Sequence, residues 1–596
     1  MPTSPHLPSF PRVFFPPPGG GGDISGVYPG GAGLNAHAIR IIVYPWDESI
    51  RCSDHLYSPA FVQFGKLSTT TTMAPHADAA ASSSAPITAP PSSSSYSISD
   101  PQLLYINGQY RPSSDGATFP VVNPMTGETI YHSASATLDD YSAAIENAHA
   151  TFQTWSKTSP SARRKIFLKA ADIMESYIKS SPGGGAPELL SQEISATMHW
   201  VRVNVFATAG LFREAASLAT HIRGEIVPAD REGTTLLVER SAVGVVFGIS
   251  PWNAPINLTA RAVAVPLICG NTVVLKPSEY TPKSQDLVVR ALAEAGLPQG
   301  ALNFLPTGRE RTPEVTEYAV KHPKVLRVNF TGGDRVGRII AGWAAECLKQ
   351  CVLELGGKAP VIVFEDANLD DAVEAVVFGA LAFSGQVCMS TERVLLHRSI
   401  AGEFKEKLLR KVEGLKTGNH LDAHEGAAVS ISGLFTPASA ARVMDLVKKA
   451  VVDGGARLLC GDLKITGPRR TIIAPHILEN VSSEMDIAHH ETFGPVMILS
   501  EFESDDEAIA SANDSDFSLC ASVFSRDTLR ALDVARQVRA GACHINGPTI
   551  YVESTLPNGG TGGSSGYGRF GGIAGVEEFT ERKIISLAKP GMKFAF

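Results

Sequence analysis

Between residues 242 and 355 the apolar positions alternate between two spacings, with short β-rich runs followed by longer stretches of helical period. The expected strands are residues 242–249, 272–275, 302–305, 325–330 and 352–355, and the expected helices are residues 257–268, 285–295, 314–320 and 336–347. Gly270 ends the first of these helices. Strands that alternate with helices predict an α/β fold, in which a parallel sheet is covered on both faces. Such sheets bind ligands beyond the carboxyl ends of their strands.

The turns after three of these strands have unusual residues. They are Pro251-Trp252-Asn253, Lys276-Pro277-Ser278-Glu279, and the stretch 330–337, which holds Gly332, Gly333 and Gly337 and leads into a helix. A glycine-rich turn at a helix start lets backbone N–H groups approach an anionic phosphate, helped by the helix dipole. Taken singly, each turn is more typical of a tight loop, because none is a GxGxxG or Walker sequence.

Residues 1–98 differ in composition from the rest of the chain. They hold 14 of the 39 prolines and end in stretches of Ser, Thr, Ala and Pro. This composition buries too little apolar surface to offset chain entropy, so we expect disorder. A mitochondrial presequence is a weak interpretation, because the three arginines up to Arg51 are matched by three acidic residues. Met73 opens a more ordinary Ala/Ser-rich start, which leads to the hypothesis that the mature protein lacks residues 1–72.

Charge and cysteine usage exclude several classes of protein. The 596-residue chain has a net charge of −8 and no Lys/Arg run, which argues against a nucleic-acid partner. No apolar run approaches the ~18 residues of a membrane span, and no secretory signal is recognisable. The eight cysteines are scattered without a CxxC pair, so neither disulfides nor a zinc site are expected. We expect a soluble cytoplasmic protein, with a mitochondrial location as the alternative.

Five motifs, in order along the chain, resemble those of the aldehyde dehydrogenase superfamily. They are Pro251-Trp252-Asn253, Lys276-Pro277-Ser278-Glu279, Glu354-Leu355-Gly356-Gly357-Lys358, Gly385-Gln386-Val387-Cys388 and Glu491-Thr492-Phe493-Gly494-Pro495-Val496. The resemblance runs from about residue 104 to residue 585. Within the superfamily, the sequence around Asn253 with Arg261 downstream, and the sequence around Cys388, look most like the salicylaldehyde and vanillin dehydrogenase branch.

The resemblance implies three catalytic residues. Cys388 would be the nucleophile, because adding a thiolate to an aldehyde gives a hemithioacetal that expels hydride readily. Asn253 would donate its side-chain amide to the oxyanion, and Glu354 would be the general base that activates water against the resulting thioester. Each of the other seven cysteines is expected to be an ordinary buried residue.

The family pattern also implies a dinucleotide site. Lys276 and Glu279 would bind the adenosine ribose, Glu491 the nicotinamide ribose, and Phe493 would pack near the nicotinamide. Because a carboxylate accepts hydrogen bonds from a free 2′-hydroxyl and repels a 2′-phosphate, Glu279 favours NAD over NADP. The full expected set is Ser250, Pro251, Trp252, Lys276, Ser278, Glu279, Gly332, Gly333, Gly337, Leu355, Glu491 and Phe493. The adjacent His489 and His490 are not expected to bind a metal, since no second cluster completes a coordination shell.

Four residues are expected, by the same resemblance, to contact the substrate: Ala254, Asn257, Arg261 and Tyr551. Small Ala254 would admit a flat ring, and Arg261 could bind a phenolate or a carboxylate. The hypothesis is therefore a hydroxylated aromatic aldehyde. The alternative for Arg261 is a cation on a helix surface.

Two departures from the family pattern bear on activity. Gly333 stands where the family often has Ser, so a hydroxyl contact to the pyrophosphate is lost. The stretch 557–569 is one residue longer than the common form, with Asn558 in place of a phenylalanine that usually lines the substrate funnel. A catalytically altered member that acts as a binding or scaffold protein is therefore one alternative. A CoA-acylating dehydrogenase is another, and the retained Glu354 argues against it.

The expected organisation has four parts. Residues 1–98 are a disordered extension, residues 99–355 an NAD-binding domain with a bridging hairpin at about 227–241, and residues 356–560 a catalytic domain. Residues 561–596 would return to the cofactor domain and end in an oligomerisation tail, with residues 584–588 as an edge strand. The resemblance implies a homodimer or homotetramer.

Overall fold

The computed structural model describes residues 97–179 and 185–593. In it, one seven-stranded sheet contains all the strands expected between residues 242 and 355. The strand order is β11-β10-β7-β8-β9-β1-β2. Its strands are β1 (Leu104–Ile106), β2 (Gln109–Arg111), β7 (Val245–Ile249), β8 (Thr272–Lys276), β9 (Leu302–Phe304), β10 (Val325–Thr331) and β11 (Gln350–Glu354). Strands β7 to β11 pair in parallel, which confirms the predicted sheet. The predictions for residues 1–96, namely disorder, the start at Met73 and the absence of a presequence, lie outside the described residues.

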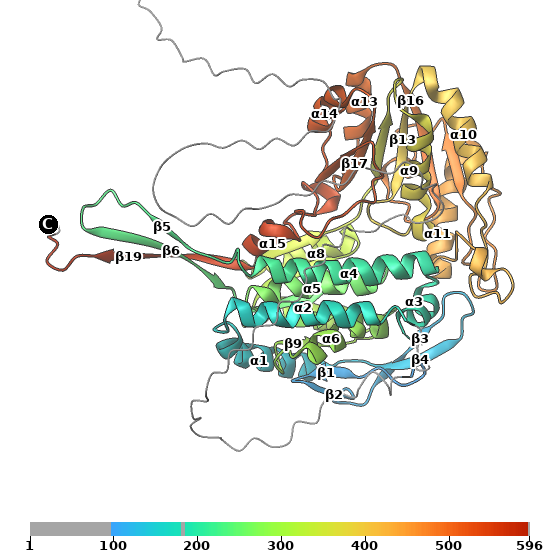
Figure 1. Ribbon diagram of the computed structural model, residues 1–596. Helices are drawn as coiled ribbons and strands as arrows, with labels where there is room; N and C mark the ends of the chain where they lie inside the picture. Colours follow the sequence, from blue (N-terminus) through green and yellow to red (C-terminus); the bar gives the residue numbers. More distant parts are fainter. Residues whose placement is uncertain (1–96, 180–184, 594–596) are drawn as a thin grey trace, which may run out of the picture. The chain divides into compact units, whose positions relative to one another are not determined.

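Helices cover both faces of this sheet, as the alternating pattern predicts (Figure 1). They are α1 (Leu138–Trp155), α2 (Pro160–Ser176), α3 (Ala186–Ile194), α4 (Met198–Leu218), α5 (Pro255–Ile268), α6 (Pro282–Ala295), α7 (Thr312–Lys321) and α8 (Asp334–Glu346). Val246 packs in one core cluster with α2, α4, α5 and α6, whereas its neighbours Val245 and Phe247 pack in another with α1, α7 and α8. Alternate residues of β7 therefore face opposite helix layers.

The expected strand at 242–249 is wrong at its start. Ala242 ends a different strand, β6 (Thr234–Ala242), and the chain turns at Gly244, whose φ is +146°. Asn271 Oδ1 accepts hydrogen bonds from the N–H groups of Val243 and Gly244, at 2.8 and 3.0 Å, and so stabilises the turn. The sequence hides this break, because residues 242–249 form one continuous apolar run across the turn.

A second seven-stranded sheet, in the order β14-β15-β16-β13-β12-β17-β18, forms the rest of the core. Its strands are β12 (Ala359–Val363), β13 (Thr391–His397), β14 (Arg457–Cys460), β15 (His476–Glu479), β16 (Val496–Phe502), β17 (Cys520–Phe524) and β18 (Ala542–Ile545). Its helices are α9 (Leu369–Leu381), α10 (Ala401–Glu413), α11 (Pro437–Lys448), α12 (Asp486–His489), α13 (Asp505–Asn513) and α14 (Thr528–Gln537). The expected boundary between residues 355 and 356 falls between β11 and β12, and the division into domains stays a prediction.

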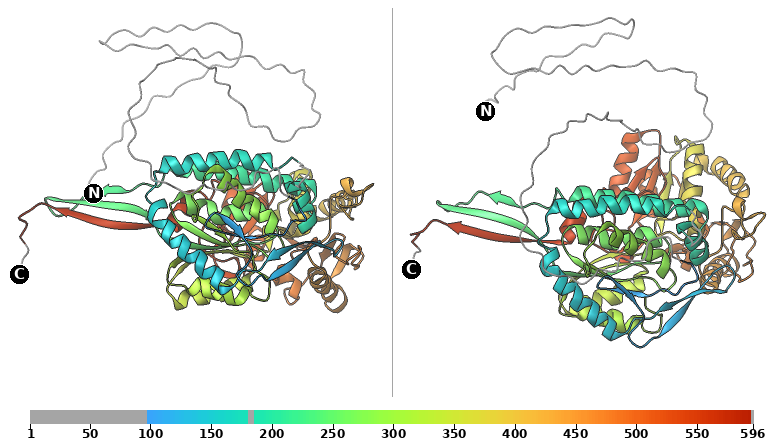
Figure 2. Two further views of the ribbon diagram at one scale, coloured as in Figure 1. Left: turned by 90° about the horizontal axis from the view of Figure 1, so that it is seen from below. Right: turned by 60° about the horizontal axis from the view of Figure 1, so that its bottom comes forward.

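A three-stranded ribbon joins the end of the chain to its middle. Strand β19 (Thr580–Ala588) pairs antiparallel with β6, which pairs with β5 (Glu225–Val227), and the three lie side by side in both views of Figure 2. The expected hairpin and the expected edge strand are both present, with Ile584 opposite Val238. A short helix, α15 (Gly572–Glu578), precedes β19, and β3 (Thr118–Val122) with β4 (Thr129–Ala134) forms a separate hairpin. Among residues 97–179 and 185–593, no helix is long and apolar enough to cross a membrane.

Candidate active site

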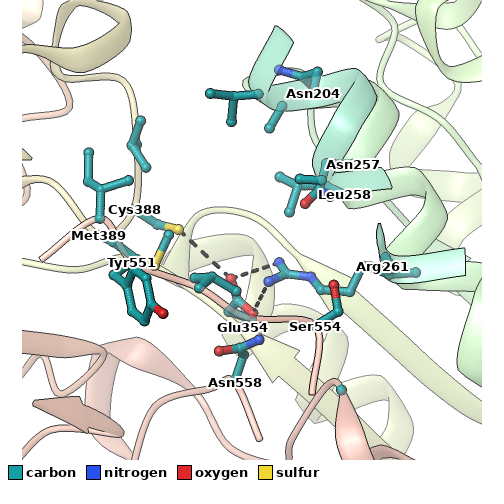
Figure 3. A pocket seen from close by; sticks show the side chains of 18 of the residues that line it. Asn204, Asn257, Leu258, Arg261, Glu354, Cys388, Met389, Tyr551, Ser554 and Asn558 are labelled. Atoms are coloured by element: carbon teal, nitrogen blue, oxygen red, sulfur yellow. Dashed lines mark hydrogen bonds and ion pairs between the residues drawn. The ribbon is translucent and has the colours of Figure 1, made fainter. Parts of the chain in front are cut away.

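The two large sheets bring Asn253, Glu354 and Cys388 together. Glu354 is the last residue of β11, Asn253 lies in the turn between β7 and α5, and Cys388 lies in the loop before β13. The Cys388 Sγ atom is 3.8 Å from Glu354 Oε1 (Figure 3). The Asn253 amide donates to the Gln386 carbonyl at 3.1 Å. The thiol thus has a carboxylate beside it, with an amide donor on the same cavity wall.

The loop before Cys388 has an unusual backbone. Phe383 and Ser384 have φ angles of +47° and +57°, and Gly385 has +73°. A Cβ on Gly385 would lie 2.1 Å from the Gly494 carbonyl oxygen, so glycine is required there. Trp200 of α4 stacks on Phe383 and donates its indole N–H to the Asn253 carbonyl at 2.8 Å. One helix therefore supports both the cysteine loop and the asparagine turn.

Two cavities meet at this point. The first, which we call the apolar cavity, has a volume of about 270 Å³, and the second, the polar cavity, has about 290 Å³. Asn253, Leu258 and Cys388 line both. All four expected substrate residues line the apolar cavity together with Glu354; these are Ala254, Asn257, Arg261 and Tyr551.

The expected cofactor residues divide into three groups. Seven of them line the polar cavity: Pro251, Trp252, Gly332, Gly333, Leu355, Glu491 and Phe493. Glu279 lines a separate cavity of about 550 Å³ that shares Phe435 with the polar cavity. Ser250, Lys276, Ser278 and Gly337 are buried and line none of the three cavities. Burial lowers the pKa of Lys276, whose ammonium donates to the Pro277 carbonyl at 3.1 Å.

The start of α8 suits an anionic group. Gly333 is its N-cap and makes no side-chain capping bond, so the first N–H groups of the helix have no capping side chain. A Cβ on Gly333 would meet nothing within 4 Å, so the loss of the family serine has no steric cause. Gly332 and Gly333, which line the polar cavity, therefore lead directly into this helix start.

Glu491 is partly exposed and lines the polar cavity. Burial, together with the nearby Glu392 carboxylate, raises its pKa to about 8. The Gly357 N–H donates to Glu491 Oε1 at 2.9 Å and opposes this rise. The Lys358 ammonium pairs with Glu392 at 2.6 Å, and Glu392 accepts the Phe493 N–H at 3.1 Å, which anchors the segment that carries Glu491.

Arg261 does not lie on a helix surface, so that alternative is wrong. Its side chain is 10% exposed and pairs with Glu354: Nη2 donates to Oε1 at 2.7 Å, and Nη1 lies 2.7 Å from Oε2. Burial and the Glu354 charge raise the pKa of the Cys388 thiol well above its usual range, while Arg261 acts in the opposite direction. The site thus holds a protonated thiol beside an ion-paired carboxylate.

The stretch 557–569, which departs from the family pattern, is held in place by backbone hydrogen bonds. Asn558 lines the apolar cavity and exchanges two backbone hydrogen bonds of 2.8 Å with Phe570. Residues 565–567 run along β11, where Leu353 donates to the Tyr567 carbonyl at 2.8 Å and Leu355 to the Ser565 carbonyl at 3.1 Å. The altered segment therefore supports the strand that ends at Glu354.

One face of α4 was missed by the sequence reasoning. It contributes Trp200, Val203, Asn204, Ala207 and Leu211 to the apolar cavity. Their spacing of three and four residues was a usable signal, but it is also the spacing of any packed helix. Among the described residues, no group of three or more His, Cys, Asp or Glu side chains could hold a metal ion.

Comparison with known proteins gives consistent matches over most of the chain. The aldehyde dehydrogenase family model matches residues 110–585. A salicylaldehyde dehydrogenase of Pseudomonas sp. (strain C18) is 42% identical over 493 residues, covering 83% of this chain and 99% of the relative. A vanillin dehydrogenase of Pseudomonas sp. (strain HR199 / DSM 7063) is 42% identical over 485 residues, covering 81% and 97%.

Solved structures agree with the sequence comparison. The crystal structure of a salicylaldehyde dehydrogenase from Pseudomonas putida G7, complexed with salicylaldehyde, matches with a TM-score of 0.78 at 41% identity, covering 83% of this chain and all of that one. A betaine aldehyde dehydrogenase from Staphylococcus aureus in complex with NAD⁺ matches with a TM-score of 0.78 at 29% identity, covering 83% and 96%. The family model covers most of this chain, and the relatives match it over nearly their whole length. Together with the site that gathers Cys388, Glu354 and Asn253, these matches show that this chain belongs to the aldehyde dehydrogenase family.

Proposed function

We propose that this protein oxidises a hydroxylated aromatic aldehyde to the carboxylic acid, with NAD as the acceptor and Cys388 as the nucleophile. One observation carries the proposal: Cys388 and Asn253 line both cavities, so a group bound in either one reaches the same sulfur. The apolar cavity, at about 270 Å³, suits a ligand of one aromatic ring.

The residues around the polar cavity fit a dinucleotide. The uncapped N-terminus of α8 suits a pyrophosphate, and Glu491 on the cavity wall suits a ribose hydroxyl. Glu279 in the adjoining cavity favours NAD over NADP, because a 2′-phosphate would meet its carboxylate. When bound, NAD supplies the hydride acceptor.

Three residues of this chain would carry out the other steps of the reaction. The Cys388 thiol, which its raised pKa leaves protonated, would lose its proton to solvent as sulfur adds to the aldehyde. The Asn253 amide and the Cys388 backbone N–H would stabilise the oxyanion that forms when sulfur adds to the aldehyde. Glu354 then activates the water that hydrolyses the thioester.

The substrate class rests on the walls of the apolar cavity and on the relatives. Ala254 leaves room for a flat ring, and Arg261 supplies a buried cation within the cavity. The matched relatives include a salicylaldehyde dehydrogenase and a vanillin dehydrogenase. A hydrolytic carboxylate beside the cysteine favours transfer of the acyl group to water over transfer to CoA.

The ribbon of β19, β6 and β5 supports a homodimer or homotetramer. Ile226, Ile584 and Leu587 are exposed at 76%, 73% and 54% in this ribbon. Exposed apolar side chains on edge strands are a typical oligomer contact.

The test is NADH formation by the full chain with aromatic and aliphatic aldehydes, with NAD or NADP, beside Cys388→Ala and Glu354→Gln. We expect steady turnover to fall at least about 10³-fold in both variants, with a burst of NADH that survives only in Glu354→Gln. Absence of turnover with every aldehyde would instead favour the binding-protein alternative.

A further inference from the structure

An ion pair occupies the base of the apolar cavity. Both oxygens of Glu354 face the Arg261 guanidinium, and the two side chains are 5% and 10% exposed (Figure 3). The Phe570 ring lies 5.0 Å from the guanidinium carbon, and Thr331 Oγ1 is 3.4 Å from Nη2. Little water reaches the pair, so its attraction is stronger than that of a surface pair.

This arrangement conflicts with the work that thioester hydrolysis requires of Glu354. Because both of its oxygens are paired with the guanidinium, the Glu354 carboxylate is held in an orientation that Arg261 sets. To activate water, Glu354 must turn at least one oxygen away from Arg261. The pair therefore has to loosen during each catalytic cycle.

The substrate is the group best placed to loosen it. One oxygen of Glu354 lies close to both Cys388 and Arg261. Glu354 Oε1 is 3.8 Å from Cys388 Sγ and 2.7 Å from Arg261 Nη2. An acyl group on Cys388 carries its ring into the same cavity, and an oxygen on the neighbouring ring carbon is the substituent nearest to the reacting carbon. Phenolate and carboxylate oxygens are the partners that a guanidinium binds most strongly.

We propose that Arg261 is a positioning residue that restrains Glu354, and that an oxygen ortho to the substrate carbonyl takes over the guanidinium and releases Glu354 for hydrolysis. This inference rests on the proposed function of the site. The released carboxylate takes a proton from water while the water oxygen bonds to the thioester carbon. The carbon–sulfur bond breaks, the Glu354 proton passes to the Cys388 thiolate, and the carboxylic acid leaves.

The test compares 2-hydroxybenzaldehyde, 4-hydroxybenzaldehyde and benzaldehyde in rapid-quench experiments with NAD. The NADH burst reports acylation, and mass spectrometry of the quenched protein follows loss of the acyl group from Cys388. With the unaltered chain we expect release to be at least about 10-fold faster for the ortho-hydroxy substrate than for the other two. In Arg261→Leu the three release rates should become equal within about twofold. A ratio near one in the unaltered chain, or an unchanged ratio in Arg261→Leu, would overturn the inference.

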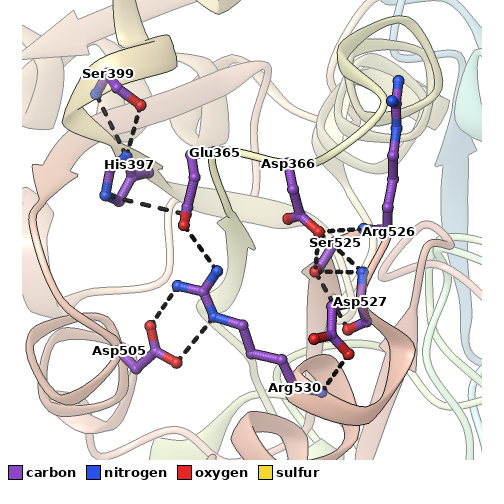
Figure 4. A network of polar contacts seen from close by, with 9 residues as sticks. All are labelled: Glu365, Asp366, His397, Ser399, Asp505, Ser525, Arg526, Asp527 and Arg530. Atoms are coloured by element: carbon purple, nitrogen blue, oxygen red, sulfur yellow. Dashed lines mark hydrogen bonds and ion pairs between the residues drawn. The ribbon is translucent and has the colours of Figure 1, made fainter.

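Two further variants guard against a merely structural effect. Arg261→Lys keeps the charge but cannot pair with two oxygens, so its ratio should fall between those of the unaltered chain and Arg261→Leu. Arg530 on α14 is a matched control, because it pairs with Asp505 at 2.6 Å and packs over a ring, that of Phe364, at 4.1 Å. Figure 4 places it in a separate polar network with Glu365, so Arg530→Leu should retain the full ratio.

The proposed function and this inference fail in different ways. If no aldehyde gives NADH, the proposed function is wrong. If NADH forms and the ortho-hydroxy substrate shows no faster release, only the restraint by Arg261 is wrong.

Discussion

At the residue scale, the charges around Cys388 decide how the thiol behaves. Burial raises its pKa most, Glu354 raises it further, Arg261 lowers it, and Glu491 raises it again with a smaller effect. The buried Cys520 thiol on β17 also lies close enough to contribute. A free thiol in such surroundings is protonated at neutral pH, so its reactivity depends on the neighbours.

This balance predicts opposite effects of two substitutions on alkylation of Cys388. Glu354→Gln removes a negative charge that raises the thiol pKa, so the midpoint of the iodoacetamide rate against pH should move down by about one unit. Arg261→Leu removes the opposing positive charge, so the midpoint should move up.

The measurement needs only the protein and the reagent, with Cys388→Ala as the blank. Glu491→Gln should lower the midpoint less than Glu354→Gln does, because its charge contributes less. Equal midpoints in all variants would show that burial alone controls the thiol.

At the element scale, Glu354 depends on the support of its own strand. Residues 565–567 add backbone hydrogen bonds to β11 on the side away from β10. Gly566 has φ +79°, and a Cβ there would lie 2.2 Å from the Leu353 carbonyl oxygen. The glycine-rich departure from the family pattern is thus compatible with a firmly held strand end.

Gly566→Ala should therefore both destabilise the protein and weaken catalysis. We expect a loss of about 2–4 kcal/mol in the free energy of unfolding, from left-handed strain plus the displaced hydrogen bond to β11. Denaturant titration with an activity assay measures both effects.

Gly562→Ala is the matched control for this prediction. Its φ is +118°, but a Cβ there would meet nothing within 4 Å, so only the backbone strain of about 1 kcal/mol remains. If the two variants lose the same stability, contact with β11 does not matter.

At the scale of the whole molecule, the ribbon ties the chain end to the sheet that contains β7 to β11. Strand β19 pairs with β6 along its full length, and Arg327 of β10 pairs with Glu581 at 2.6 Å. The outer strands β5 and β19 leave apolar side chains in solvent. In the homodimer or homotetramer proposed above, a second copy of the chain would cover them.

We accordingly expect Ile226→Glu combined with Ile584→Glu to shift the protein toward monomers in sedimentation velocity at micromolar concentration. Leu529→Glu is the control, because Leu529 is 74% exposed on α14, outside the ribbon. A charge buried in an interface costs far more than one on a free surface. An unchanged oligomer in the double variant would contradict the proposed interface.

Most of the sheet that contains β7 to β11 could be predicted from the sequence, since strand and helix periods are local properties. Its helices begin slightly earlier than expected, and α5 and α6 begin at prolines, whose fixed φ suits the first turn. The break at Gly244 was missed, because an apolar run has no period that marks where one sheet ends and the next begins.

The sequence by itself determined the parallel sheet and the unusual turns at its carboxyl ends, which follow from local patterns. It also gave Asn253, Glu354 and Cys388 as candidate catalytic residues, which follow from the order of motifs shared with the family. Only the tertiary structure decided that Arg261 pairs with Glu354, that α4 lines the apolar cavity, and that residues 565–567 support β11. Those contacts join segments up to hundreds of residues apart, and their partners depend on how two sheets pack, which no local pattern records.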